Sequence, residues 1–154
     1  MSGIFYGKEQ FDAQFIISQM LCMQALHYLG LGVAYVLMDS LMGVPLSLDQ
    51  FFGDDIFADG MGNRRAWATV FGAFIAAFLN TAALYVVVQR AKKCLDFGIT
   101  LYVWHIVLCV VYNGLPGAWE WWVSTIGSCV ATILLGEYVC ARREMRDITI
   151  VRGV

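Results

Sequence analysis

The residues best suited to chemistry are two histidines, His27 and His105, which both fall inside long apolar runs. Imidazole nitrogens bind haem iron and zinc, so the depth of each ring in its run matters. Counted from the expected start of each run, His27 lies about 18 Å deep and His105 about 12 Å deep. This mismatch disfavours coordination of one iron by both rings. His105 and Cys109 share a helix face, but two ligands do not make a zinc site. We therefore expect no metal and no cofactor.

Other polar side chains also lie within apolar runs, where they are costly and need a reason. Gln24 precedes His27 by three residues on the same face of a helix, and Asn80 falls near the centre of the second run. One interpretation is a polar pathway or ligand site formed with His105. The other is hydrogen bonding between helices, worth roughly 0.6–2 kcal/mol per bond. No set of nucleophile, base and orienting residue appears, so we expect no enzyme.

The elements that carry these residues are four apolar runs in a chain of 154 residues, 60% hydrophobic and 14% charged. Soluble domains carry about 25% charged residues. Each run has about 19 to 23 residues, and a helix needs about 20 to cross the hydrocarbon core of a membrane. Backbone groups cannot stay unpaired in lipid, so each run is expected to be a helix. The sequence predicts an all-α membrane protein, a single domain with four transmembrane helices at about 15–37, 66–88, 97–115 and 119–141.

The distribution of Lys and Arg predicts the orientation of these spans. With four spans, residues 1–14, 89–96 and 142–154 share one side of the membrane, and they hold eight of the ten basic residues. Basic residues are enriched on the cytosolic side, so both termini are predicted to be cytosolic. The loop at 38–65 is then lumenal. Its acidic segment, Asp54 to Gly60, lacks the ligand spacing of an EF-hand.

A short helix is predicted within this lumenal loop. Ser47 and Gln50 have the spacing of a capping box, and Leu46 and Phe51 that of the matching hydrophobic staple. We expect an amphipathic helix that begins at Ser47 and lays Phe51 and Phe52 against the membrane surface.

Small residues predict which spans pack closely. The second span has small or short side chains at every fourth position from residue 68 to 80, and the fourth span has them from residue 124 to 136. Such ridges let helix backbones approach one another in lipid. We expect tight contacts of the second and fourth spans.

Charge and cysteine usage exclude other classes of protein. The net charge is −2 and no Lys/Arg-rich run appears, so nucleic acid is not an expected partner. No two of the five cysteines are spaced as CxxC, which argues against a disulfide framework. Cys94 and Cys140 fall at the cytosolic boundary, a position at which cysteines can be palmitoylated.

Several separate segments, each weak alone, together carry a family resemblance. They are Gln19-Met20, Met23-Gln24, Ser47-Leu48-Asp49-Gln50, Cys94-Leu95-Asp96-Phe97, His105, Trp121-Trp122 and Gly136-Glu137-Tyr138-Val139-Cys140 followed by Arg142, Arg143 and Glu144. In this order and spacing they resemble the Sys family, small four-span proteins of the Golgi membrane. The resemblance covers nearly the whole chain.

This resemblance implies recruitment. Sys proteins serve as the Golgi membrane receptor for an Arf-related small GTPase that is acetylated at its N-terminus, and the pathway supports vesicle traffic from endosomes to the trans-Golgi. A protein receptor can supply contacts that a missing lipid anchor does not, for example by accepting an amphipathic helix in a groove. The expected partner-binding residues are the charged ones on the cytosolic face: Arg90, Lys92, Lys93, Asp96, Glu137, Arg142 and Arg143.

Two alternatives to this function stay open. In the first, the chain is an accessory subunit of a larger membrane complex, and the other subunits pack on the small-residue ridges. Less well supported is a small transporter that uses Gln24, His27, Asn80 and His105, because the sequence shows neither an inverted repeat nor helices broken by Gly or Pro.

Overall fold

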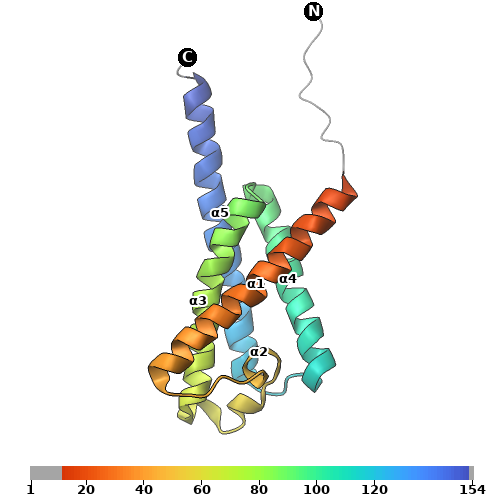
Figure 1. Ribbon diagram of the computed structural model, residues 1–154. Helices are drawn as coiled ribbons and strands as arrows, with labels where there is room; N and C mark the ends of the chain where they lie inside the picture. The colour runs from red at the N-terminus through yellow and green to blue at the C-terminus, as the bar shows by residue number, and fades with distance from the viewer. Residues whose placement is uncertain (1–11, 153–154) are drawn as a thin grey trace, which may run out of the picture.

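Four long helices make up most of the described part of the chain. The structure, a computed structural model, describes residues 12–152, with side chains described for residues 12–146. The helices are α1 (Ala13–Met42), α3 (Arg64–Val87), α4 (Ala91–Asn113) and α5 (Trp119–Arg152) (Figure 1). Each is long and apolar enough to cross a membrane. The predicted all-α fold with four spanning helices is therefore confirmed.

The helices are arranged around α3, which packs on α1 along one side and on α5 along the other, while α4 packs on α5. With 30 residues, α1 is about 45 Å long, well beyond the ~30 Å hydrocarbon core. A helix of this length can cross the core at a tilt or extend beyond it. In Figure 1, α1 runs obliquely across the other helices, as a tilted helix does.

Local residue chemistry sets the helix boundaries. Asp12 caps α1, because its carboxylate accepts hydrogen bonds from the backbone N–H groups of Gln14 (3.1 Å) and Phe15 (3.3 Å). Gly43 ends α1 in the left-handed region (φ 66°), where glycine carries no Cβ penalty. Asn63 caps α3 through its side-chain oxygen.

The small-residue ridges lie in the helix contacts, as predicted. A Cβ on Gly136 of α5 would lie 2.7 Å from Leu84 Cδ1 of α3, so the two helices meet at van der Waals distance there. The Thr132 hydroxyl, one turn earlier, donates to the Ala77 carbonyl of α3 (3.5 Å). The tight helix contacts expected of the second and fourth spans are therefore confirmed.

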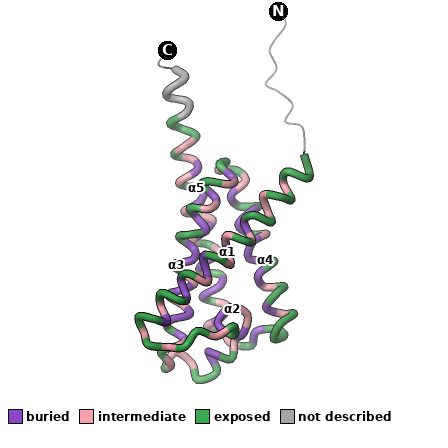
Figure 2. Tube along the Cα trace, viewed as in Figure 1, coloured by how far each residue is buried: buried purple, intermediate pink, exposed green. Residues whose placement is uncertain are grey.

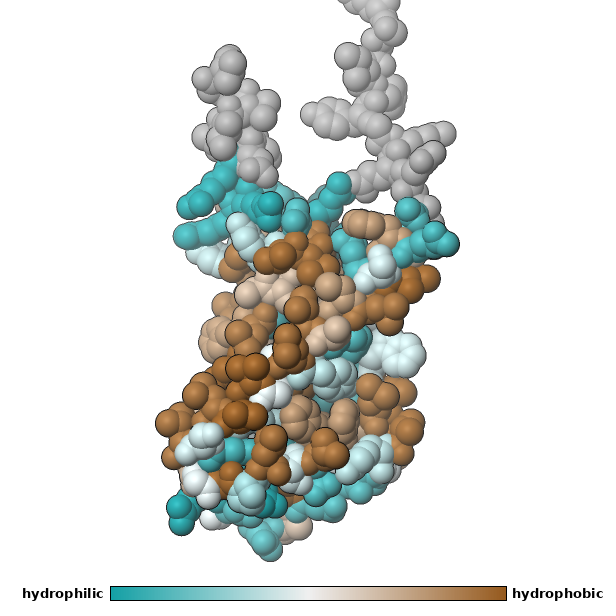
Figure 3. All heavy atoms as spheres, in the orientation of Figure 1, coloured by the Kyte–Doolittle hydropathy of each residue, from teal (hydrophilic) through white to brown (hydrophobic). Residues whose placement is uncertain are grey.

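The outward faces of the helices are apolar. Leu21, Val111 and Leu134 are 66%, 79% and 61% exposed, and buried residues lie on the inward faces (Figure 2). Figure 3 shows the consequence: a broad hydrophobic band lies between two hydrophilic ends. A water-soluble surface rarely exposes apolar patches of this extent, so lipid is the solvent of this band.

The two ends of the bundle differ. At one end of the bundle α3 passes into α4, and α5 continues beyond this end. We call it the basic end, because Arg90, Lys92 and Arg142 lie there. The opposite loop end carries residues 43–63 and 114–118. At the basic end α4 begins at Ala91, six residues before the expected start at 97. Lys92, Lys93 and Asp96 thus belong to the first turns of a helix and not to a loop.

The predicted amphipathic helix in the long loop is not confirmed. Only one turn forms, α2 (Asp49–Phe52), followed by two 3-10 turns, η1 (Asp55–Phe57) and η2 (Gly60–Gly62). Gln50 Oε1 accepts from the Ser47 N–H (3.2 Å), as in a capping box, but the Ser47 hydroxyl accepts from the Asp49 N–H (3.2 Å) instead of that of Gln50.

The aromatic residues of α2 point into the bundle and not toward the membrane surface. The Phe51 ring lies edge-on to Tyr35 of α1 at 4.9 Å, and the Phe52 ring lies 5.7 Å from that of Tyr28. Gln50 is buried and donates to Asp39 Oδ1 (2.9 Å) at the end of α1. The spacing predicted the cap but not the ring contacts with Tyr35 and Tyr28, which remove aromatic surface of Phe51 and Phe52 from the surroundings of the bundle. As a result, α2 covers the loop end of the bundle.

Asp54 connects the long loop to the start of α5. Its Oδ2 accepts hydrogen bonds from the Gly117 and Ala118 N–H groups, and its Oδ1 from Asn113 Nδ2 (3.2 Å). A carboxylate at this position satisfies free donors and complements the positive end of the helix dipole.

Replacing Asp54 by alanine is expected to destabilise the bundle by about 1–2 kcal/mol, the usual cost of a lost helix cap. Asp54→Asn keeps one acceptor oxygen and should lose less. Equilibrium unfolding in mixed micelles measures both. The matched control is Asp59→Ala, because Asp59 is exposed in the same loop and caps no turn through its side chain. Equal effects of Asp54→Ala and Asp59→Ala would contradict the capping role.

Candidate functional site

A polar cluster lies inside the bundle, built from residues that the sequence analysis singled out. Asn80 of α3 hydrogen-bonds His27 of α1 (Nδ2 to Nδ1, 2.9 Å), and both side chains are buried. The His27 and His105 rings lie 5.3 Å apart, nearly perpendicular. Tyr28 OH bonds His105 Nδ1 (3.2 Å). The structure therefore brings together three of the four intramembrane polar residues.

The expected difference in depth between the two histidines is wrong. Each lies 14 residues, or about 21 Å, beyond the first residue of its helix, since α1 begins at Ala13 and α4 at Ala91. The depth was misjudged because the apolar run that predicted the third span starts after the charged first turns of α4. The two rings are level and in contact.

Further polar contacts continue from this cluster toward the basic end. Gln24 Nε2 of α1 donates to the Leu101 carbonyl of α4 (3.2 Å), separately from the histidines. Tyr102 OH of α4 bonds the Thr132 hydroxyl of α5 (3.1 Å). Tyr28 and Tyr102 were not predicted as members of this network. Tyr28 follows His27 by one residue and Tyr102 precedes His105 by three. This spacing was the only signal in the sequence for their place in the network. All four long helices are thereby joined by polar contacts.

The second group of predicted site residues lies at the basic end. Lys92, Asp96, Glu137 and Arg142 are exposed, and so is Arg90, which precedes α4; Lys93 and Arg143 are half-buried. Lys92 and Asp96 are one helical turn apart on α4, while Glu137 and Arg142 lie on α5. The helices α4 and α5 pack on one another, so one end of this helix pair presents charges of both signs.

Arg143 is held by the bundle. Its Nη1 donates to the Tyr85 carbonyl near the end of α3 (3.3 Å), and its guanidinium lies over the Tyr85 ring at 5.0 Å from the centroid. Arg142 lies over the Tyr138 ring of its own helix at 4.9 Å. Arg143 thus satisfies a carbonyl that the end of α3 leaves unpaired.

Two other side chains close helix ends here, and neither was predicted. Glu144 Oε1 of α5 accepts from the Ala91 N–H at the start of α4 (3.1 Å), and Gln19 Nε2 of α1 donates to the Val87 carbonyl at the end of α3 (2.9 Å). Together with Arg143, they connect the turn between α3 and α4 to both α1 and α5. Hydrogen bonds between helices therefore hold in place the helix ends that carry the charged surface of the basic end.

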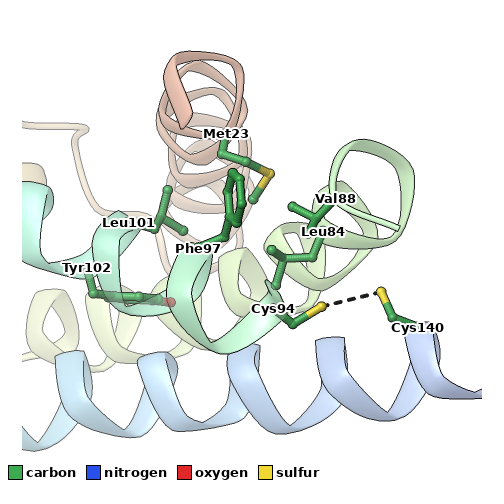
Figure 4. Packing of buried hydrophobic residues seen from close by; sticks show 8 residues of the cluster. All are labelled: Met23, Leu84, Val88, Cys94, Phe97, Leu101, Tyr102 and Cys140. Atoms are coloured by element: carbon green, nitrogen blue, oxygen red, sulfur yellow. Dashed lines mark hydrogen bonds between the residues drawn. The ribbon is translucent and has the colours of Figure 1, made fainter. Parts of the chain in front are cut away.

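Cys94 and Cys140 lie in the contact of α4 with α5. Their sulfur atoms are 3.4 Å apart and both side chains are fully buried (Figure 4). Phe97 and Leu84 belong to the same apolar cluster. Neither sulfur lies on the surface where an acyl chain would be attached, so packing is the role that this geometry supports.

Comparison with known proteins places the chain in a family. The SYS1 family model, described as "Integral membrane protein S linking to the trans Golgi network", matches residues 6–150. The chain is 32% identical over 142 residues to "Protein SYS1 homolog" of Nematostella vectensis, covering 92% of this chain and 89% of that protein. It is 32% identical over 150 residues to "Protein SYS1 homolog" of Dictyostelium discoideum, covering 97% of this chain and 64% of that longer protein.

No solved structure matches the chain. The family match spans all four long helices, the long loop and the basic end. The predicted resemblance to the Sys family is therefore confirmed, and the chain belongs to the SYS1 family of integral Golgi membrane proteins.

Proposed function

We propose that this protein is a trans-Golgi membrane receptor that recruits an N-terminally acetylated Arf-related small GTPase and so supports vesicle traffic from endosomes. The family match over residues 6–150 carries the proposal, because the resemblance implies this role. A GTPase without a lipid anchor needs protein contacts at the membrane, since even one myristoyl chain gives only marginal binding.

The orientation in this proposal places the basic end in the cytosol. Eight of the ten Lys and Arg residues fall in the N-terminal segment, the turn before and first residues of α4, and the chain after α5 leaves the apolar band. Lys8 is among them and lies outside the described residues, and Arg152 ends the helix α5. An excess of basic residues marks the cytosolic side. Both termini would then be cytosolic, on the side where a small GTPase is available.

The contacts at the basic end divide the predicted partner-binding residues into two groups. Arg143, like Glu144, bonds the backbone of another helix, so its first role is to hold the end of the bundle together. Lys92, Asp96, Glu137 and Arg142 are the predicted partner-binding residues of α4 and α5 that are exposed, and their exposure favours contact with a partner. We infer that Asp96 and Glu137, the acidic members, meet basic groups of the GTPase, because complementary charge fixes partner and register.

Charge reversal tests this surface. Asp96→Lys and Glu137→Lys are each expected to reduce the amount of GTPase that co-purifies from solubilised membranes by about tenfold, the effect of losing roughly 1.4 kcal/mol. The matched control is Asp59→Lys, an exposed acidic residue of the loop end, which should leave recovery unchanged.

Recovery equal to that of the unmodified protein for both variants would remove these two positions from the site. If the unmodified protein itself brings down no GTPase but elutes in a large stable assembly, the receptor proposal fails and the accessory-subunit alternative gains support.

A further inference from the structure

A small polar cavity lies among the four long helices, beneath α2. Its volume is about 30 Å³. Its lining includes hydroxyl groups of Ser124, Thr125 and Ser128 of α5 and Thr69 of α3. The imidazoles of His27 and His105 also line it. Such a lining is unusual inside an apolar bundle and calls for an occupant that forms hydrogen bonds.

Two buried polar atoms bordering this cavity have no protein partner among the described residues. They are Nε2 of His27 and the hydroxyl oxygen of Ser128, and each side chain is only 2% exposed. Because Asn80 Nδ2 is a donor, the bonded Nδ1 of His27 accepts, and in the neutral ring Nε2 then carries the hydrogen. His27 therefore presents a donor and Ser128 an oxygen that both donates and accepts. A buried polar group left without a partner is destabilising, so both atoms call for a hydrogen-bonding partner.

Packed side chains border the cavity toward both ends of the bundle. Toward the basic end lies the apolar cluster of Met23, Leu84 and Leu101 (Figure 4). Toward the loop end, Gln50 and Phe51 of α2 form part of the cavity wall. A cavity needs roughly 10–15 Å³ to hold a water molecule, so this one has room for about two.

We propose that this cavity is a binding site for one or two water molecules, held by Nε2–H of His27 and the Ser128 hydroxyl, and joined to the hydroxyls of Ser124 and Thr125. Water suits the lining because it donates and accepts, whereas an acyl chain would leave the hydroxyls unpaired. The site would join α1 to α5 through hydrogen bonds to the bound water. This proposal stands independently of the receptor function.

The two histidines make the test direct, because they are the only two in the sequence. The full chain is labelled uniformly with ¹⁵N, reconstituted in phosphatidylcholine liposomes and studied by solid-state NMR with transfer of magnetisation from water. The His27 Nε2–H signal, assigned by its loss in His27→Asn, is expected to receive magnetisation from water at a mixing time at which lipid-facing amides receive none. A His27 signal no stronger than that of those amides would overturn the proposal.

A matched pair of substitutions on α3 separates bound water from general exposure. Ala73 lines the cavity, and Ala82 is exposed on the outward face of the same helix. Ala73→Leu fills the cavity without removing a polar group and is expected to abolish transfer to His27, whereas Ala82→Leu leaves it unchanged. If Ala73→Leu does not fold, Thr125→Val, which keeps the volume and removes one hydroxyl, should weaken the transfer. Transfer unchanged in both cavity variants would contradict the site.

Discussion

Replacing Gly72 by alanine is expected to destabilise the bundle by about 1–3 kcal/mol, the usual cost of overpacking a tight contact. A Cβ at position 72 would lie 2.8 Å from Tyr35 Cε1, and still closer to the adjacent ring carbon Cδ1. Tyr35 cannot move aside easily, because its ring is buried and packs edge-on against Phe51. The helices α1 and α3 must therefore separate. The measurement is the free energy of unfolding in mixed micelles.

Gly32→Ala is the matched control for this prediction. Gly32 lies in α1, and a Cβ added there would meet nothing within 4 Å. Alanine should be neutral or slightly stabilising at that position, because it has the higher helix propensity. If both variants unfold like the parent protein, Gly72 is not a contact-determining residue. In a Tyr35→Ala background, Gly72→Ala should lose most of its effect, since the obstructing ring is gone.

The helical architecture was predictable because lipid leaves few alternatives. A run of about 20 apolar residues must form a helix there, and α1, α3, α4 and α5 all follow that rule. The ridge from Ala68 to Asn80 also predicted close packing correctly. In α3, Gly72 contacts α1, whereas Ala77, five residues further along, contacts α5. The sequence did not show this division, because small residues lie on two faces of that helix.

Depth within the bundle was less predictable than span. Hydropathy reports which residues contact lipid, whereas a helix begins where its backbone hydrogen bonds begin. In α4 these two positions differ, since the helix starts at Ala91 and the apolar run at 97. This difference misplaced His105 relative to His27 and hid the contact between their rings. Burial of the two rings side by side depends on helix tilt and register, which periodicity alone does not report.

The polar contacts that close helix ends were beyond sequence analysis altogether. Asp54 caps the start of α5 from 63 and 64 residues away, and Glu144 caps that of α4 from 53 residues away. Both residues belong to charged segments, and the sequence of such a segment does not distinguish a solvated side chain from one that caps a helix by hydrogen bonds. Similarly, the capping-box spacing of Ser47 and Gln50 could not reveal that α2 stops after one turn and turns its phenylalanines inward.

Replacing Asn80 by leucine is expected to destabilise the bundle by about 1–3 kcal/mol. The substitution keeps a similar volume but removes the donor to His27 Nδ1, leaving that nitrogen buried without its partner. Exposing the His27 nitrogen to lipid would not lower this cost, because the hydrocarbon core offers no replacement donor. The free energy of unfolding in mixed micelles again provides the measurement.

A double-mutant cycle with His27→Leu isolates the interaction of the two side chains. His27→Leu alone leaves the Asn80 amide unpaired, while the double variant leaves neither group unsatisfied. The double variant should therefore be less destabilised than the two single effects added together, by roughly 0.5–2 kcal/mol. Simple additivity would mean that Asn80 and His27 do not interact in the membrane. Because their bond joins α3 to α1 beside the polar cavity, a positive coupling would also show that the pairing which orients His27 Nε2 exists in the folded protein.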